Sequence, residues 1–141
     1  MEKKRKNLAI VENAPIISEG IQNLLQKSHL FIKSIWIKDV ENLHFHVDRL
    51  KIDIILINPN FILNKVKYFA QIKNNFPHIK WIALTYSILD KEIQSFFDEV
   101  IPINDSYDSI TRKIDYFLAN SEVEGVHALT EREQNVLKEI I

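Results

Sequence analysis

The chain has 141 residues, of which 46% are hydrophobic and 26% are charged, and its formal net charge is −1. This is the usual balance of one soluble globular domain with a sizeable core. With two glycines and no cysteine, the composition excludes a Gly-rich phosphate loop, a disulfide scaffold and thiolate metal sites. No apolar run approaches the roughly 20 residues of a membrane span, and the first residues lack the pattern of a signal peptide. We therefore expect a cytoplasmic protein without membrane contact.

The N-terminal half alternates short β-branched runs with amphipathic segments, a pattern that indicates βαβ units and a parallel sheet. A predicted strand at residues 8–11 precedes a helix with Pro15 in its first turn, where proline is tolerated. A second strand at 31–37 and a second helix at 40–50 follow. The third strand, at 54–57, is apolar throughout, as is typical of a strand covered by helices on both faces.

The C-terminal half continues the same alternation. The predicted elements are a helix, a strand, a short helix, a strand and a helix, at residues 64–76, 81–84, 91–97, 100–103 and 107–118. Pro102 places the last strand at a sheet edge, and Asp105 or Ser106 is suited to cap the helix that follows. Together the elements predict an α/β fold with a doubly wound, five-stranded parallel sheet.

The sequence pattern changes after residue 119. Residues 120–128 are polar, contain Gly125 and lack periodicity, which is typical of a linker. Residues 129–141 begin with a capping box at Thr130 and Glu133 and continue with an apolar helix face. We expect this helix to dock on the body or on a partner, or the natural protein to continue past residue 141.

Several strings resemble one known family in the right order. Residues 11–15, 18–21, 53–58 and 76–85, the last reading FPHIKWIALT against the family's YPDIKVIVLT, resemble the receiver domain of response regulators. Residues 129–137 resemble the first helix of a LuxR-type helix-turn-helix domain. The resemblance implies a flavodoxin-like sheet of order 2-1-3-4-5, with a receiver-like domain at 1–119, a linker at 120–128 and an incomplete helix-turn-helix domain at 129–141.

The resemblance also implies where the family's phosphorylation site would lie. Family receivers hold Mg²⁺ with three carboxylates, phosphorylate an aspartate after strand three, and contact the phosphoryl group with a threonine or serine and a lysine. The matching residues here are Glu12, Asn13, Asn58, Thr85 and Asn104. A carboxamide is no nucleophile for phosphoryl transfer, so Asn58 replaces the phosphoacceptor without its chemistry. We expect a degenerate receiver that is not phosphorylated, carries no catalytic residue and binds Mg²⁺ weakly or not at all.

Two further surfaces follow from the resemblance. The family's common dimerisation surface is matched by Ile101, Ile103, Tyr107 and Ile110, although burial against the sheet would remove at least half of them. The start of the DNA-binding domain is matched by Thr130, Arg132, Glu133, Val136 and Leu137. We expect a homodimer, with DNA contacted through a C-terminal domain that is absent from this chain.

The sequence leads to three functional hypotheses. The leading hypothesis is the regulatory domain of a LuxR-type transcription regulator that works without phosphorylation, controlled by dimerisation, a partner protein or a ligand in the vacated pocket. The alternative is a stand-alone interaction module that sequesters a partner regulator or kinase. A small hydrolase or phosphatase that uses Glu12 is the third, and it lacks a second titrating group. His44 and His46 are two residues apart, so on a helix they point to different faces and do not form a metal pair.

Overall fold

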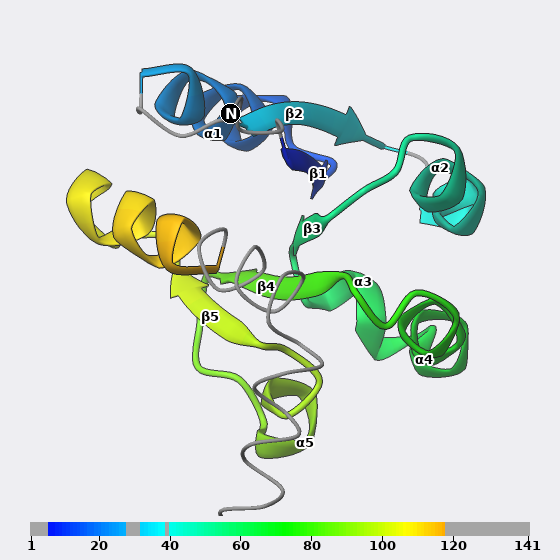
Figure 1. Cartoon of the computed structure of the whole chain (residues 1–141). Helices are drawn as coiled ribbons and strands as arrows, with labels where there is room; N and C mark the ends of the chain where they lie inside the picture. Colours follow the sequence, from blue (N-terminus) through cyan, green and yellow to red (C-terminus); the bar gives the residue numbers. More distant parts are fainter. Residues whose placement is uncertain (1–5, 28–31, 39, 118–141) are drawn as a thin grey trace, which may run out of the picture.

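The computed structural model describes residues 6–27, 32–38 and 40–117. Within these ranges the chain forms one sheet with helices on both faces (Figure 1). The predicted linker at 120–128 and the predicted start of a helix-turn-helix domain at 129–141 lie outside the described residues. Those two predictions therefore remain predictions.

Five parallel strands form the sheet. They are β1 (Lys6–Val11), β2 (Ile32–Ile37), β3 (Ile54–Ile57), β4 (Lys80–Thr85) and β5 (Glu99–Pro102). Their order is β2-β1-β3-β4-β5, which confirms the predicted doubly wound sheet. Because the order reverses beside β1 and β3, the carboxyl ends of these strands form the topological switch point of the fold. Pro102 lies in the edge strand, as its missing N–H requires.

Helices cover the two faces of the sheet in two groups. They are α1 (Pro15–Lys27), η1 (Val40–Asn42), α2 (Leu43–Arg49), α3 (Asn60–Leu63), α4 (Val66–Asn75), α5 (Lys91–Gln94) and a helix at residues 107–117. Figure 1 shows α1 and helix 107–117 on one face and α2, α3 and α4 on the other. Two hydrophobic clusters, one on each face, form the core between helices and sheet.

The core explains why the strands form where they do. All four residues of β3 are buried, and Trp81 in β4 is fully buried, with its ring 5.2 Å from that of Phe96 and 6.2 Å from that of Phe69. A continuous apolar run of this kind buries side chains on both faces of a parallel sheet. No helix of the described ranges is long and apolar enough to cross a membrane.

Three helical details differ from, or refine, the predictions. The short helix α3 was not predicted; it begins where Phe61 N–H donates to the Asn58 carbonyl at 3.1 Å. Helix α5 ends at Gln94 instead of residue 97, since Phe96 and Phe97 pack into the core cluster beside Trp81. Of the two predicted caps for helix 107–117, Ser106 fills the role, because its Oγ accepts the Ser109 N–H at 3.2 Å.

Candidate functional site

The candidate site lies at the carboxyl ends of β1, β3 and β4. Glu12 follows β1 directly, Asn58 follows β3, and Thr85 is the last residue of β4. The Asn58 N–H donates to the Val11 carbonyl at 3.3 Å, which ties the end of β3 to the end of β1. Parallel pairing thus brings together side chains 46 and 73 residues away from Glu12 in the sequence.

Glu12 is a buried carboxylate, 2% exposed, whose two oxygens both accept hydrogen bonds. Its Oε2 accepts from the backbone N–H of Asn13 at 2.8 Å and of Ala14 at 3.3 Å, just before α1 begins. Its Oε1 accepts from the hydroxyl of Tyr86 at 2.5 Å. The Glu12 carbonyl also accepts from Trp36 Nε1 at 2.6 Å. Among the described residues, the hydrogen-bond donors to this buried carboxylate are neutral groups, which satisfy its acceptor oxygens.

Tyr86 provides the third side chain of this network, which we call the closed site because the Tyr86 hydroxyl occupies Glu12 Oε1, although Tyr86 itself is 49% exposed. It follows Thr85 at the end of β4, and its hydroxyl donates to Glu12 while the Asn58 side chain hydrogen-bonds to it. Burial raises the pKa of Tyr86 from 10.0 to about 12, and the hydrogen bond to Glu12 and the negative charge of Glu12 act in the same direction. The Asn58 hydrogen bond acts in the opposite direction. Tyr86 is therefore a neutral donor at physiological pH.

Asn58 is fixed by a hydrogen bond to its side-chain oxygen and lies beside Tyr86. The residue is 9% exposed; its Oδ1 accepts from the Asn60 N–H at 3.0 Å, and its side chain contacts the Tyr86 hydroxyl. The hydrogen bond from the Asn60 N–H closes a local side-chain-to-backbone turn of the kind that asparagine favours. Asn58 thus starts α3 and anchors Tyr86 at the same time.

The other predicted site residues lie around this network without joining it. Thr85 is buried, and its carbonyl accepts from the Ile103 N–H at 2.7 Å. The side chains of Asn13 and Asn104 are exposed, and across the described ranges no hydrogen bond joins either side chain to Glu12 or Asn58. The structure therefore brings together two of the five predicted residues and adds Tyr86, which the sequence analysis missed.

The arrangement does not fit Mg²⁺. That ion prefers octahedral oxygen coordination with carboxylate ligands, and Glu12 is the one carboxylate in contact with Asn58 or Tyr86 among the residues that the structure describes. Both of its oxygens already accept protein donors. No group of three His, Cys, Asp or Glu side chains suited to a metal occurs in the described ranges. We therefore derive no step through a metal ion.

The predicted dimerisation residues lie elsewhere, on the face covered by α1. Ile101 is fully buried, Ile103 and Ile110 are partly buried against the same core cluster, and Tyr107 is 44% exposed. Ile101 thus belongs to the core, in line with the expected loss of part of this set to burial. Dimerisation through the exposed remainder stays a prediction.

Comparison with known proteins identifies the fold. The chain matches no protein-family model and no curated protein. Among solved structures it is similar to a response regulator from Thermotoga maritima, with a TM-score of 0.71 and 17% identity over 82% of this chain and 99% of that one. The fold is therefore that of a response-regulator receiver domain.

DNA-binding response regulators are among the similar structures. The RcsB response regulator of Salmonella typhimurium matches with a TM-score of 0.69 and 16% identity, over 84% of this chain and 62% of that one. A LuxR family DNA-binding response regulator from Silicibacter pomeroyi matches with a TM-score of 0.65 and 15% identity, over 82% of this chain and 93% of that one. At these identities the likeness concerns the fold.

Proposed function

We propose that this chain is the regulatory domain of a LuxR-type DNA-binding regulator and that it works without phosphorylation. One observation carries the proposal: the Tyr86 hydroxyl lies between Glu12 and Asn58, bonded to Glu12 at 2.5 Å. In the family that the sequence resembles, this end of the sheet holds the metal and the phosphoryl group. Here a side chain of the protein takes that place.

The chemistry of the residues supports the same conclusion. Phosphoryl transfer to a receiver needs a carboxylate nucleophile, and Asn58 offers a neutral carboxamide without an anionic oxygen. It also needs positive charge to offset the incoming phosphate, and neither Glu12 nor Tyr86 supplies it. A phosphoryl group at Asn58 would instead meet the negative charge of Glu12. The residues of the site therefore favour a fixed hydrogen-bonded structure over a cycle of phosphorylation and dephosphorylation.

A catalytic use of Glu12 finds no support in its contacts. A general acid or base needs a free oxygen within reach of a substrate and a pKa near the working pH. Both Glu12 oxygens are engaged by Asn13, Ala14 and Tyr86. We assign Glu12 a structural role as the acceptor that fixes Tyr86 and the start of α1.

The assignment to LuxR-type regulators rests on two supports. The solved structures that share the fold include DNA-binding response regulators, and residues 129–137 resemble the first helix of a LuxR-type domain. DNA recognition would then belong to the LuxR-type domain whose first helix residues 129–137 resemble. Control would pass through a homodimer or a partner protein, because the pocket no longer carries a phosphorylation signal.

The experiment that tests the proposal is exposure of the full chain to acetyl phosphate and Mg²⁺, followed by intact-mass measurement. A receiver domain that retains its phosphoacceptor aspartate, treated in parallel, shows that the reagent is active. We expect an unchanged mass for this chain. An added phosphoryl group that disappears in an Asn58→Ala variant would overturn the proposal.

A second test separates the leading function from a stand-alone interaction module. The gene is read past codon 141. An open frame that encodes a turn and a basic recognition helix supports the regulator, whereas a stop codon supports a module that sequesters a partner. In either case the closed site at Glu12 and Tyr86 stays the same.

A further inference from the structure

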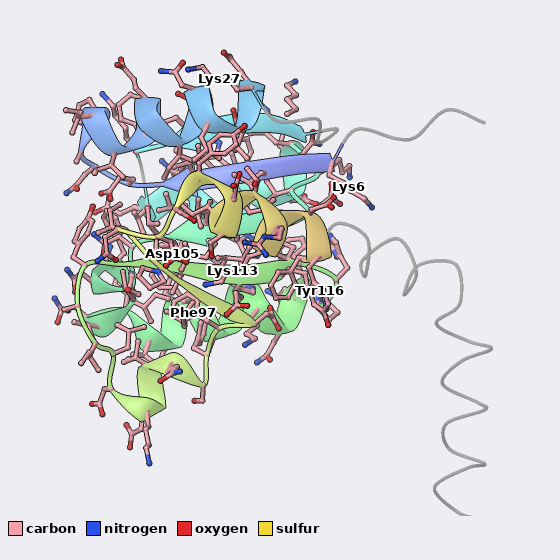
Figure 2. All side chains as sticks on the ribbon, turned by 90° about the vertical axis from the view of Figure 1, so that its left-hand side faces the viewer. Lys6, Lys27, Phe97, Asp105, Lys113 and Tyr116 are labelled. Atoms are coloured by element: carbon pink, nitrogen blue, oxygen red, sulfur yellow. The ribbon has the colours of Figure 1, made fainter. Side chains whose placement is uncertain are left out.

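An apolar groove lies apart from the contacts of Glu12. It is a groove of about 350 Å³ between α1 and helix 107–117, floored by the sheet. Figure 2 looks onto this face, with α1 running above helix 107–117. Apolar side chains from α1, β4, β5 and helix 107–117 line it, among them Ile17, Ile21, Leu84, Ile101 and Ile110. None of Glu12, Asn58 and Tyr86 is part of it, so this groove is independent of the closed site.

Gly20 keeps part of the groove open. It lies inside α1, where glycine costs roughly 1 kcal/mol relative to alanine. Its backbone needs no positive φ, and a Cβ built on it would meet no atom within 4 Å. The packing of this chain therefore does not require a glycine here. The missing side chain instead leaves free volume in the groove wall.

Asp105 is the single charged residue of the lining. Its Oδ2 accepts from Lys113 Nζ at 2.9 Å and from Ser109 Oγ at 3.1 Å. Within the part of the chain that the structure describes, no donor reaches its Oδ1. The hydrogen bond from Lys113 holds the pKa of Asp105 below its usual value, so the residue remains a carboxylate at neutral pH. One acceptor oxygen is thus available at the edge of an apolar hollow.

We propose that this groove binds a small apolar molecule with one hydrogen-bond donor, an N–H or O–H. The apolar body would lie beside Gly20, between α1 and helix 107–117, and the donor would bond to Asp105 Oδ1. A hollow lined by apolar side chains with one placed polar group is the usual form of a small-molecule site, and its volume lies in the range of such sites.

The size of the apolar surface favours a small molecule over a protein partner. A stable protein interface needs roughly 800 Å² on each partner. The outward residues of α1 beside the groove, Glu19, Asn23 and Gln26, are exposed and polar. The apolar surface therefore stays within the hollow, apart from Ile16 and Tyr107 at its mouth. Binding of a second copy of this chain at the groove is therefore a competing outcome of the test.

The test uses two probes that differ in one group. The full chain labelled with ¹⁵N is titrated with indole and with indene, which has the same shape and no N–H, and amide shifts are followed by NMR. We expect both probes to shift the amides of Gly20, Leu84 and Ile110 in a saturable way. Indole should bind about fivefold more tightly, as one hydrogen bond of typical strength allows.

Variants at two positions assign the site. Gly20→Phe places a ring in the open space and should weaken indole binding at least tenfold, while the matched control Gly20→Ala should leave it within about twofold. Asp105→Ala should reduce indole binding to the level of indene. Because no atom lies near the added Cβ, both Gly20 variants should fold, and their NMR spectra verify this.

Several outcomes would overturn the proposal. They are the absence of a saturable shift, shifts centred outside the groove, equal binding of indole and indene, or full binding by Gly20→Phe. Sedimentation measurements on the same variants test one further outcome that would overturn the proposal. If Gly20→Phe converts a dimer into a monomer and the wild type binds neither probe, the groove is a contact between copies instead.

Discussion

Two regions of this domain are built in opposite ways. At the carboxyl ends of β1 and β3 the protein closes the site with its own side chains: Glu12, Asn58 and Tyr86 satisfy one another. Between α1 and helix 107–117 an apolar groove stays open beside Gly20, and the donors to Asp105 among the described residues all reach Oδ2, not Oδ1. The first region lies at the topological switch point of the fold. The second is the groove for which we propose a small apolar ligand.

The contrast shows how buried polar groups around a single carboxylate are satisfied by their neighbours. A pocket of buried polar groups left without partners would destabilise the fold, since each unsatisfied group costs about 1–3 kcal/mol. Tyr86 meets this requirement by donating to Glu12 and accepting from Asn58. Four variants, in order of expected effect on the free energy of unfolding, can break or sharpen the comparison.

The floor of the open groove should be part of the core. Leu84 is 4% exposed and packs in the cluster under α1, so Leu84→Ala should lower the free energy of unfolding by about 3 kcal/mol. At the mouth of the same groove Ile16 is 80% exposed, and Ile16→Ala should change it by less than about 0.5 kcal/mol. Urea denaturation measures both. Equal losses would show that the groove is filled in solution.

The second-largest effect on the free energy of unfolding should come from Glu12, the acceptor of the closed site. Glu12→Ala leaves the Tyr86 hydroxyl and the N–H groups of Asn13 and Ala14 without their partner, so we expect a loss of about 2–3 kcal/mol. Glu19→Ala, which removes an exposed carboxylate from α1, is the matched control and should be near neutral. If thermal unfolding shows no difference between the two variants, the hydrogen bonds of Glu12 contribute nothing to stability.

Removing one hydroxyl should have a smaller effect. Tyr86→Phe keeps the ring and removes the bonds to Glu12 and Asn58, and we expect a loss of about 1 kcal/mol. Glu12 retains its two backbone donors, which is why the loss is smaller than for Glu12→Ala. The change is read from the denaturant midpoint, with Tyr116→Phe, at a residue that is 61% exposed, as the control. A stabilised Tyr86→Phe would contradict the proposed network.

The smallest of the four effects should be an increase in the free energy of unfolding. Gly20→Ala adds a Cβ into open space within α1, so it should raise the free energy of unfolding by about 0.5–1 kcal/mol. Calorimetry would detect this as a higher unfolding temperature. A loss of stability would mean that the groove wall is closed at Gly20, and the contrast between the two regions would fail.

The fold was predictable because its signals are local and strong. Each of the five strands lies within two residues of its predicted range, since continuous apolar runs such as 54–57 stand out from amphipathic neighbours. Helix α3 was not predicted. It depends on the hydrogen bond of Asn60 N–H to the Asn58 side chain, a turn that carries no periodicity.

The site was predictable only in part. The positions of Glu12 and Asn58 follow from strand ends, because carboxyl ends of parallel strands meet at one edge. Tyr86 did not emerge, since its role depends on the direction of one side chain after β4 and on contacts with residues 28 and 74 positions away. An aromatic residue directly after Thr85, in a pocket already short of charges, was the available signal.

The ionisation of Tyr86 tests the central claim most directly. Its pKa of about 12 lies above the ordinary tyrosine value near 10, so the stability that its neutral form contributes is complete below pH 10 and is lost as the pH rises toward 12. Tyrosine ¹³Cζ shifts measured by NMR as the pH is raised, with Tyr86→Phe to assign the signal, report this value. We predict a pKa of Tyr86 near 12 that falls toward 10 in Glu12→Gln. A Tyr86 that titrates near 10 in the wild-type protein would show that the site is open.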